Sequence, residues 1–213
     1  MRIALSALMI SFGLASVSGL ETIPIYSTGA FGGIGDRDIN YITAYTLYHG
    51  TLGYSNPKIV DNVYGWANVS NLPLHTQWVS SYPEIVPKQD PLYAWYLVYS
   101  TSFDASAYAL NTIKINGSWA SSSYGYIYVN QELLQTNGFG WNPTPIKDFE
   151  IPLGMLRPKT NTIDFVVLGK ANIPNGVAVS ISGTAEVVPE PGSIVLTVIA
   201  LAVGLINRKR MQK

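Results

Sequence analysis

The residues of this chain best suited to chemistry are aromatic and amide side chains near predicted loops. Sugar rings present apolar CH faces that stack on flat aromatic side chains, while amide groups satisfy their hydroxyls. The ligand-binding candidates of this kind are Trp119, Tyr124, Asn137 and Trp141. They predict a glycan platform, with a lid over the core as the alternative role for each loop tryptophan. Trp78 and Trp95 are expected in the core.

No residue pattern in the sequence matches an established catalytic arrangement. The two histidines, His49 and His75, lie outside any Gly-x-Ser-x-Gly elbow or His-Glu-x-x-His helix. A glycosidase needs two carboxylates that flank the scissile bond, and the sequence brings no two acidic residues together. The acidic residues considered are Asp36, Asp38, Asp104, Asp148 and Glu150. We therefore expect no enzymatic activity, with a glycan-active enzyme as a less favoured alternative.

A glycine-rich loop carries the weak metal candidates Asp36 and Asp38. Carboxylates are ligands that Ca²⁺ prefers, so a structural calcium ion is one reading of this loop and a simple turn is the other. The glycines at 32, 33 and 35 do not form a phosphate cradle, because no Lys-Ser or Lys-Thr pair follows them. Apart from that calcium, we expect no cofactor.

The charge distribution argues against a nucleic-acid partner. The whole chain has 13 basic and 13 acidic residues, but five of the basic ones lie at its two ends. Between Leu20 and Val188, eight basic residues face twelve acidic ones, a difference of −4 (8 − 12). This leaves no basic track for phosphates. The chain also has no cysteine, so its stability must come from packing and strand pairing rather than disulfides.

The C-terminal residues 187–213 combine three features. The tripeptide Pro189-Glu190-Pro191 is expected to be extended, because proline fixes φ and disfavours helix in the residue before it. The apolar run 193–206 follows, and at about 1.5 Å per residue its helix covers about 20 Å, short of a ~30 Å hydrocarbon core. The basic cluster Arg208-Lys209-Arg210 then predicts a cytoplasmic C-terminus.

This order of elements resembles the PEP-CTERM sorting signal of bacterial exosortase substrates. The resemblance implies a membrane-tethered intermediate, processing by exosortase near the tripeptide, and a final place at the cell surface or in the extracellular matrix. An ordinary short C-terminal anchor is the alternative.

The N-terminal residues 1–19 have the three regions of a secretory signal peptide. Arg2 precedes an apolar stretch from Ile3 to Leu14, and small residues follow up to Gly19. This predicts export through the Sec translocase. The chain is thus expected to consist of a signal peptide (1–19), one ectodomain (20–186) and the sorting signal (187–213).

The ectodomain composition predicts an all-β fold. Its many Tyr, Trp and β-branched residues favour strands, and no long apolar stripe has the helical period. The clearest strand runs from Leu92 to Phe103 and is apolar on both faces, which indicates a central position. Further strands are expected at 41–48, 63–69, 112–115, 124–130, 149–153, 162–168 and 177–187. A turn is expected at Asn116-Gly117 and loops over 71–87, and the short strands favour a sandwich.

Spaced residues from Asp38 to Ala185 resemble a galactose-binding-like β-jelly roll of bacterial surface proteins. They include Ile127-Tyr128-Val129-Asn130 and the runs 161–167 and 176–185. The pair Asn130-Gln131 departs from the Asn-Gly that relatives carry there. The architecture includes carbohydrate-binding modules and also domains with other roles, so the fold alone does not fix the function.

The sequence therefore predicts an exported surface or matrix protein with a jelly-roll β-sandwich, non-catalytic and associated with extracellular polysaccharide. An alternative of a different class is a self-associating structural or adhesive protein of the biofilm, whose aromatic residues pack between subunits.

Overall fold

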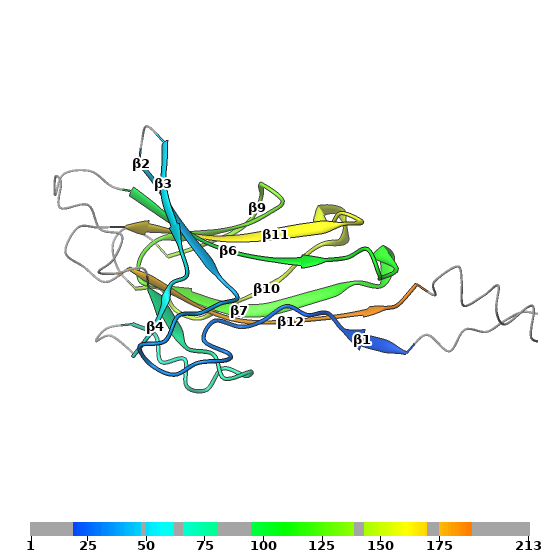
Figure 1. The fold of residues 1–213 in the computed structure, drawn as a ribbon, viewed down its shortest axis with the longest axis horizontal. Helices are drawn as coiled ribbons and strands as arrows, with labels where there is room; N and C mark the ends of the chain where they lie inside the picture. The colour runs from blue at the N-terminus through cyan, green and yellow to red at the C-terminus, as the bar shows by residue number, and fades with distance from the viewer. Residues whose placement is uncertain are drawn as a thin grey trace, which may run out of the picture. The chain divides into compact units, whose positions relative to one another are not determined.

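The chain folds into two antiparallel β-sheets that lie one above the other, as a β-sandwich does (Figure 1). The computed structural model describes residues 19–47, 50–61, 66–80, 95–138, 143–169 and 175–188. Within it, Leu20–Val187 form one compact unit. The expected all-β class is confirmed. Among the described residues, no helix has the length and apolar character that a membrane crossing requires.

The lower layer in Figure 1, called the β12 sheet, has the strand order β10-β7-β12-β5-β4, with β1 also paired to β12. Its strands are β1 (Leu20–Thr22), β4 (Lys58–Val60), β5 (Trp78–Ser80), β7 (Lys114–Ser121), β10 (Lys147–Glu150) and β12 (Gly176–Glu186).

The upper layer, called the β11 sheet, has the order β3-β2-β6-β11-β8-β9. Its strands are β2 (Ile42–Leu47), β3 (Gly50–Ser55), β6 (Trp95–Asp104), β8 (Gly125–Val129), β9 (Glu132–Asn137) and β11 (Thr160–Gly169). Strand β6 lies between β2 and β11, which confirms the expected central strand.

The main core lies between the sheets and is built by alternation along the strands. In β11, Ile163, Phe165 and Val167 point inward and are fully buried, while the residues between them are half-buried. Phe165 packs against Trp119 of the opposite sheet, with ring centroids 5.9 Å apart. Burying a large apolar side chain contributes about 1.5–3 kcal/mol, so these contacts hold the sheets together without a disulfide.

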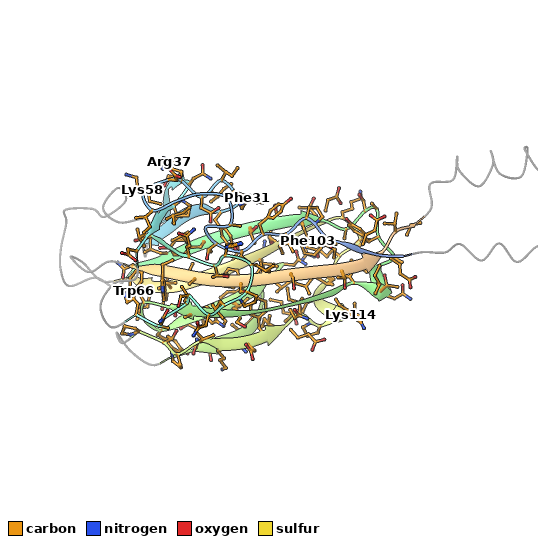
Figure 2. The ribbon with its side chains drawn as sticks, turned by 90° about the horizontal axis from the view of Figure 1, so that it is seen from below. Phe31, Arg37, Lys58, Trp66, Phe103 and Lys114 are labelled. Carbon is orange, nitrogen blue, oxygen red and sulfur yellow. The ribbon has the colours of Figure 1, made fainter. Side chains whose placement is uncertain are left out.

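A second apolar cluster covers one part of the outer face of the β12 sheet. The ring of Trp66 packs at a tilt against Trp78, with ring centroids 4.3 Å apart, and both cluster with the small residues Ala120 and Ala178. Figure 2 looks onto this face, with Trp66 toward one end of β12 and Lys114 toward the other. The expectation that Trp78 is a core residue is confirmed, because its exposed fraction is 1%.

The prediction of a turn at Asn116-Gly117 is wrong, because β7 continues through both residues to Ser121. Gly117 serves close packing instead. A Cβ atom at this position would lie 2.2 Å from the backbone oxygen of Ser180 and 2.8 Å from a ring carbon of Phe149. Only glycine fits here, and a pair that is typical of turns therefore sits inside a strand.

Expectations for the other elements have mixed outcomes. The strands expected at 41–48, 124–130, 162–168 and 177–187 are confirmed as β2, β8, β11 and β12. The strand expected at 149–153 instead ends at Glu150, and a 3-10 turn, η2 (Leu153–Met155), follows it. At 112–115, the 3-10 turn η1 (Leu110–Thr112) precedes β7.

The first half of the domain departs furthest from the expected elements. Residues 66–69 form no strand, which contradicts the strand expected at 63–69, and β5 lies within the region expected to be loop. Strands β3, β4 and β9 were not expected from the sequence. These strands are short or lack a clear alternation, so their local pattern gives little signal.

Candidate functional site

Four tyrosines, from β6, from β8 and from the position before β8, gather on the outer face of the β11 sheet, and we call this group the tyrosine face. Tyr126 and Tyr128 alternate along β8 with the buried Ile127 and Val129, so both point away from the core. Tyr124 precedes β8, and its carbonyl accepts a hydrogen bond from the backbone N–H of Leu168. Tyr96 of β6 lies opposite Leu168 in the strand register. Strand pairing thus brings together residues about 30 positions apart.

Tyr126 is the centre of this face. Its ring meets Tyr124 edge-on at a centroid distance of 4.9 Å and Tyr96 edge-on at 6.2 Å, and it lies tilted against Tyr128 at 6.0 Å. Edge-to-face pairs of this kind contribute about 0.5–1.5 kcal/mol each beyond burial. The rings therefore hold one another in place before any ligand arrives.

The phenol of Tyr126 is shielded by its neighbours. Burial raises its pKa from 10.0 to about 12, and the phenols of Tyr96 and Tyr124 add to the shift by charge repulsion and hydrogen bonding. The neutral hydroxyl, a donor and an acceptor, is the form that this environment favours.

Polar groups continue the same face beside the rings. Tyr128 lies opposite Asp164 of β11, which lies opposite Ser100 of β6. The Ser100 hydroxyl donates to Asp164 Oδ1 at 2.6 Å, and the carboxylate keeps acceptor capacity for another donor. Ring faces, phenols and a carboxylate thus share one outer sheet surface, where Tyr96 is exposed and Tyr124, Tyr126, Tyr128 and Asp164 are half-buried. Sugar rings and hydroxyls can use this combination.

The prediction that Trp119 lies near a loop and contacts a ligand conflicts with its place in the structure. Trp119 lies within β7 and is fully buried. Its indole N–H donates to Gln135 Oε1 of β9 at 2.7 Å, so the polar end of the ring is satisfied inside the protein. Because β7 does not turn at Asn116-Gly117, the tryptophan stays on the inward side of the strand.

Asn137 also has a structural role. It ends β9, its exposed fraction is 5%, and its Nδ2 donates to Thr144 Oγ1 at 3.1 Å and to the Pro145 carbonyl at 2.9 Å. The side chain ties β9 to the segment before β10. The Asn137 side chain is therefore not available to a ligand, contrary to the expectation from the sequence.

Of the other two predicted ligand residues, Tyr124 belongs to the tyrosine face and Trp141 lies outside the described residues. Sequence reasoning missed Tyr96, Tyr126 and Tyr128. The alternation of tyrosines at 124, 126 and 128 is a period-two signal that could have placed three rings on one face.

Asp36 and Asp38 shape their loop. Asp36 Oδ2 accepts the backbone N–H of Gly33 at 2.9 Å. The two oxygens of the buried Asp38 accept backbone N–H groups from Gly29 and Asn40, at 2.7 and 2.9 Å. The turn reading therefore accounts for both carboxylates. Within the described ranges, no group of three or more His, Cys, Asp or Glu side chains gathers to hold a metal ion.

The remaining candidates for chemistry are scattered. The backbone N–H and hydroxyl of Ser106 hold the pKa of the Asp104 carboxyl below its usual value, at the end of β6. Asp148 and Glu150 lie on the outer side of β10, in the other sheet. His75 is exposed in the turn before β5, while His49 lies outside the described residues, as do Pro189-Glu190-Pro191 and Arg208-Lys209-Arg210.

Comparisons with known proteins give distant likenesses. No family model matches the chain, and no curated protein matches it. Among solved structures, it is similar to the GH31 alpha-xylosidase from Xanthomonas citri, with 15% identity, 79% of this chain and 17% of that chain covered, and a TM-score of 0.40. It is also similar to a beta-glucosidase from Kluyveromyces marxianus in complex with glucose, with 8% identity, coverage of 76% and 17%, and a TM-score of 0.37.

A family 35 carbohydrate binding module from an environmental isolate has 19% identity, with 43% of this chain and 72% of that chain covered and a TM-score of 0.27. This chain spans only 17% of the length of the alpha-xylosidase and of the beta-glucosidase. Likenesses this distant assign no function to the chain.

Proposed function

We propose that this protein associates non-catalytically with extracellular polysaccharide through the tyrosine face. The observation that carries the proposal is the meeting of Tyr96, Tyr124, Tyr126 and Tyr128 on one outer surface, beside the carboxylate of Asp164. Pyranose rings stack their apolar faces on aromatic side chains, and their hydroxyls donate to carboxylates and phenols. An open sheet surface suits a long polymer, which it binds weakly at each sugar.

The non-catalytic part of the proposal is supported by the arrangement of the acidic residues. Asp148 and Glu150 project side by side from one strand, whereas the two carboxylates of a glycosidase face each other across the substrate. Asp164 lies beside the rings of the tyrosine face, and its Oδ1 accepts a hydrogen bond from Ser100.

The export half of the proposal rests on the sequence. A signal peptide at 1–19 would direct the chain to the Sec translocase, and exosortase would process the segment that contains Pro189-Glu190-Pro191. The ectodomain would then reach the cell surface or the matrix, where polysaccharide is present. We also propose the jelly-roll form of the sandwich, which is supported by a chain that crosses between the two sheets at each connection from β6 to β12 except the β8–β9 hairpin.

Retention on insoluble polysaccharides tests the binding proposal. A double variant, Tyr96→Ala with Tyr124→Ala, removes two rings that flank Tyr126. We expect its retention to be about tenfold weaker or more, because two ring contacts at about 0.5–1.5 kcal/mol each sum to about 1–3 kcal/mol, and about 1.4 kcal/mol corresponds to a tenfold change.

Tyr26→Ala is the matched control. Tyr26 is 39% exposed, close to the 40% of Tyr96, and its ring also forms an edge-to-face pair, with Phe31 at 5.0 Å. The control should bind like the unaltered protein. Equal retention of the double variant and the control would overturn the proposal for this face.

Sorting has a separate test. Mass spectrometry of envelope protein should find no peptide that spans Pro191 to Arg208, because processing removes the tail. An intact tail in the mature protein would refute the exosortase assignment and leave the binding proposal standing.

A second candidate function, self-association of the matrix protein, is favoured by two exposed apolar side chains on the same face. Leu133 lies opposite Tyr128 and is 48% exposed, and Ile42 lies opposite Ser100 and is 52% exposed. Sedimentation that depends on protein concentration without added polysaccharide, and that the tyrosine double variant abolishes, would favour this function.

A further inference from the structure

The outer face of the other sheet carries a hollow of about 610 Å³. It lies over β10, β7 and β12, and its polar lining comes from the outward residues Asn116, Ser118, Asp148, Glu150, Ser180 and Ser182. Its volume is within the range of about 300–1,000 Å³ that small-molecule sites in proteins occupy. We call it the polar hollow.

Strand register explains why these six residues meet. Asp148, Ser118 and Ser180 form one row across the three strands, and Glu150, Asn116 and Ser182 form the next. Each row has a carboxylate on β10 and a serine on β12, because outward positions two residues apart repeat on each strand.

Trp66 and Trp78 cover one part of this outer face, and we call them the tryptophan cover. The polar hollow begins where the tryptophan cover ends. The cover lies over Ala120 and Ala178, and the next outward positions along the same strands are Ser118 and Ser180. The hydroxyl of Ser180 donates to the carbonyl of Pro73 at 3.2 Å, which fixes the edge of the covering loop. A polar floor is therefore left open beside a closed apolar cluster.

Leu74 forms an apolar rim on this hollow. It is 50% exposed, and it adopts a φ of +65°, followed by His75 at +52°. A left-handed backbone is costly for a leucine, at roughly 1–2 kcal/mol. This unfavourable turn presents Pro73 and Leu74 to the hollow instead of burying the leucine.

Most of the hydrogen-bonding groups that remain available in the lining of the polar hollow are acceptors. Asp148 Oδ1 accepts from Ser118 at 2.6 Å, which leaves its second oxygen, and the Glu150 carboxylate has no hydrogen-bond partner among the described residues. The Lys147 ammonium of the same strand donates to Thr136 in the other sheet, away from this face. The Asn116 amide adds donors beside its contact with Ser182.

We infer that the polar hollow is a second saccharide site, for a sugar residue without an acidic group. Hydroxyl donors of the sugar match the two carboxylates, its acceptors match Asn116, and its CH face matches the Leu74 and Pro73 rim. Uronate or sulfate groups are repelled by Asp148 and Glu150. The inference rests on the proposed function and adds a consequence: with sites on opposite sheets, one molecule cross-links two polysaccharide chains.

The test measures binding and cross-linking by the full chain. Calorimetry with galactose and glucosamine oligomers should give two sites per chain, and galacturonate oligomers should lack the second one. Light scattering should rise when the protein meets a soluble galactan. The hollow variant, Asn116→Ala with Glu150→Ala, should retain one site and lose the scattering. Lys114→Ala is the matched control, because it alters the next outward residue of β7 outside the lining.

Each outcome separates the two sites. Loss of all binding in the tyrosine double variant, with an unchanged hollow variant, would overturn the second site and keep the proposed function. If the tyrosine double variant binds saccharide like the unaltered chain and the hollow variant binds none, the proposal for the tyrosine face is overturned instead. Absence of binding by the unaltered chain refutes both. If light scattering rises with protein alone, without galactan, the polar hollow holds a second copy of the chain, and the inference of a saccharide site is overturned.

Discussion

The two outer faces of the sandwich differ although the same strand geometry builds them. On the β11 sheet, outward positions hold Tyr126, Tyr128 and Tyr96, whose rings pack on one another. On the β12 sheet, the outward positions beyond the tryptophan cover hold small polar and acidic residues around a hollow. One face offers ring surface and the other offers hydrogen-bond acceptors.

This contrast indicates that the inward pattern of each strand fixes the fold, while much of the outward pattern is free for function. In β11 and in β7 alike, the inward side chains are buried, and they include Phe165 and Trp119, while the half-buried Gly117 has no side chain. Outside the outer cluster of Trp66, Trp78, Ala120 and Ala178, exchanges on the outward side leave that core and the strand pairing unchanged. The two faces are thus expected to respond independently to substitution, except where a residue connects the sheets.

Trp119 is such a residue, and Trp119→Ala should have the largest effect on both faces. The substitution removes a fully buried ring and the hydrogen bond to Gln135 of the opposite sheet. We expect a loss of about 3–5 kcal/mol in the free energy of unfolding, measured by chemical denaturation.

Trp119→Phe provides the sharper comparison. It keeps most of the ring and loses the indole N–H, so it should cost less and leave polysaccharide retention unchanged. Reduced retention by a stably folded Trp119→Phe protein would show that the buried ring does affect the ligand after all.

Gly117→Ala should act on the hollow and spare the tyrosine face. The added Cβ meets the Ser180 oxygen of β12 and the Phe149 ring of β10 at 2.2 and 2.8 Å, so β7 must move away from both neighbouring strands under the hollow. Overpacking of this kind costs about 1–3 kcal/mol. Denaturation should record that loss, while the alkaline titration of Tyr126 stays the same. Equal stability of Gly117→Ala and the unaltered chain would contradict the packing role of this glycine.

The strong strands of the second half could be predicted from sequence, because period-two alternation is local. The place of Trp119 could not, since it depends on whether Asn116-Gly117 turns, and Phe149 and Ser180 decide that from two other strands. The tyrosine face could be predicted in part. The sequence shows the alternation at 124, 126 and 128, but only the strand order brings Tyr96 beside these residues. The polar hollow required the register of three strands, which no local pattern contains.

The tyrosine face should also have its own pH dependence. The native structure favours the neutral phenol of Tyr126, whose pKa is about 12 instead of 10.0. Its contribution to stability is therefore complete below pH about 10 and is lost as the pH rises toward about 12, because the unfolded chain releases its proton first.

Tyr126→Phe isolates this contribution. The free energy of unfolding should fall less steeply with pH in the variant than in the unaltered chain over that range. Tyr41, whose pKa is also raised by burial, is present in both proteins and cancels in the comparison. Parallel pH profiles of the two proteins, with Tyr26→Phe as the control, would contradict the shielding of Tyr126.

The smallest expected effect lies at the turn that joins β8 to β9. Asn130 and Gln131 both have positive φ, of 52° and 75°. Asn130 is held there by its side chain, which donates to Met155 and Asn161 and accepts from the Thr162 backbone N–H. Gln131 is exposed and has no comparable support, so Gln131→Gly should raise the free energy of unfolding by about 0.5–1 kcal/mol. Asn130→Gly is the contrast: although glycine relieves the same backbone, the lost hydrogen bonds should make that variant less stable in denaturation. The opposite order of the two variants would mean that backbone strain, and not the asparagine network, determines how this turn positions Tyr128.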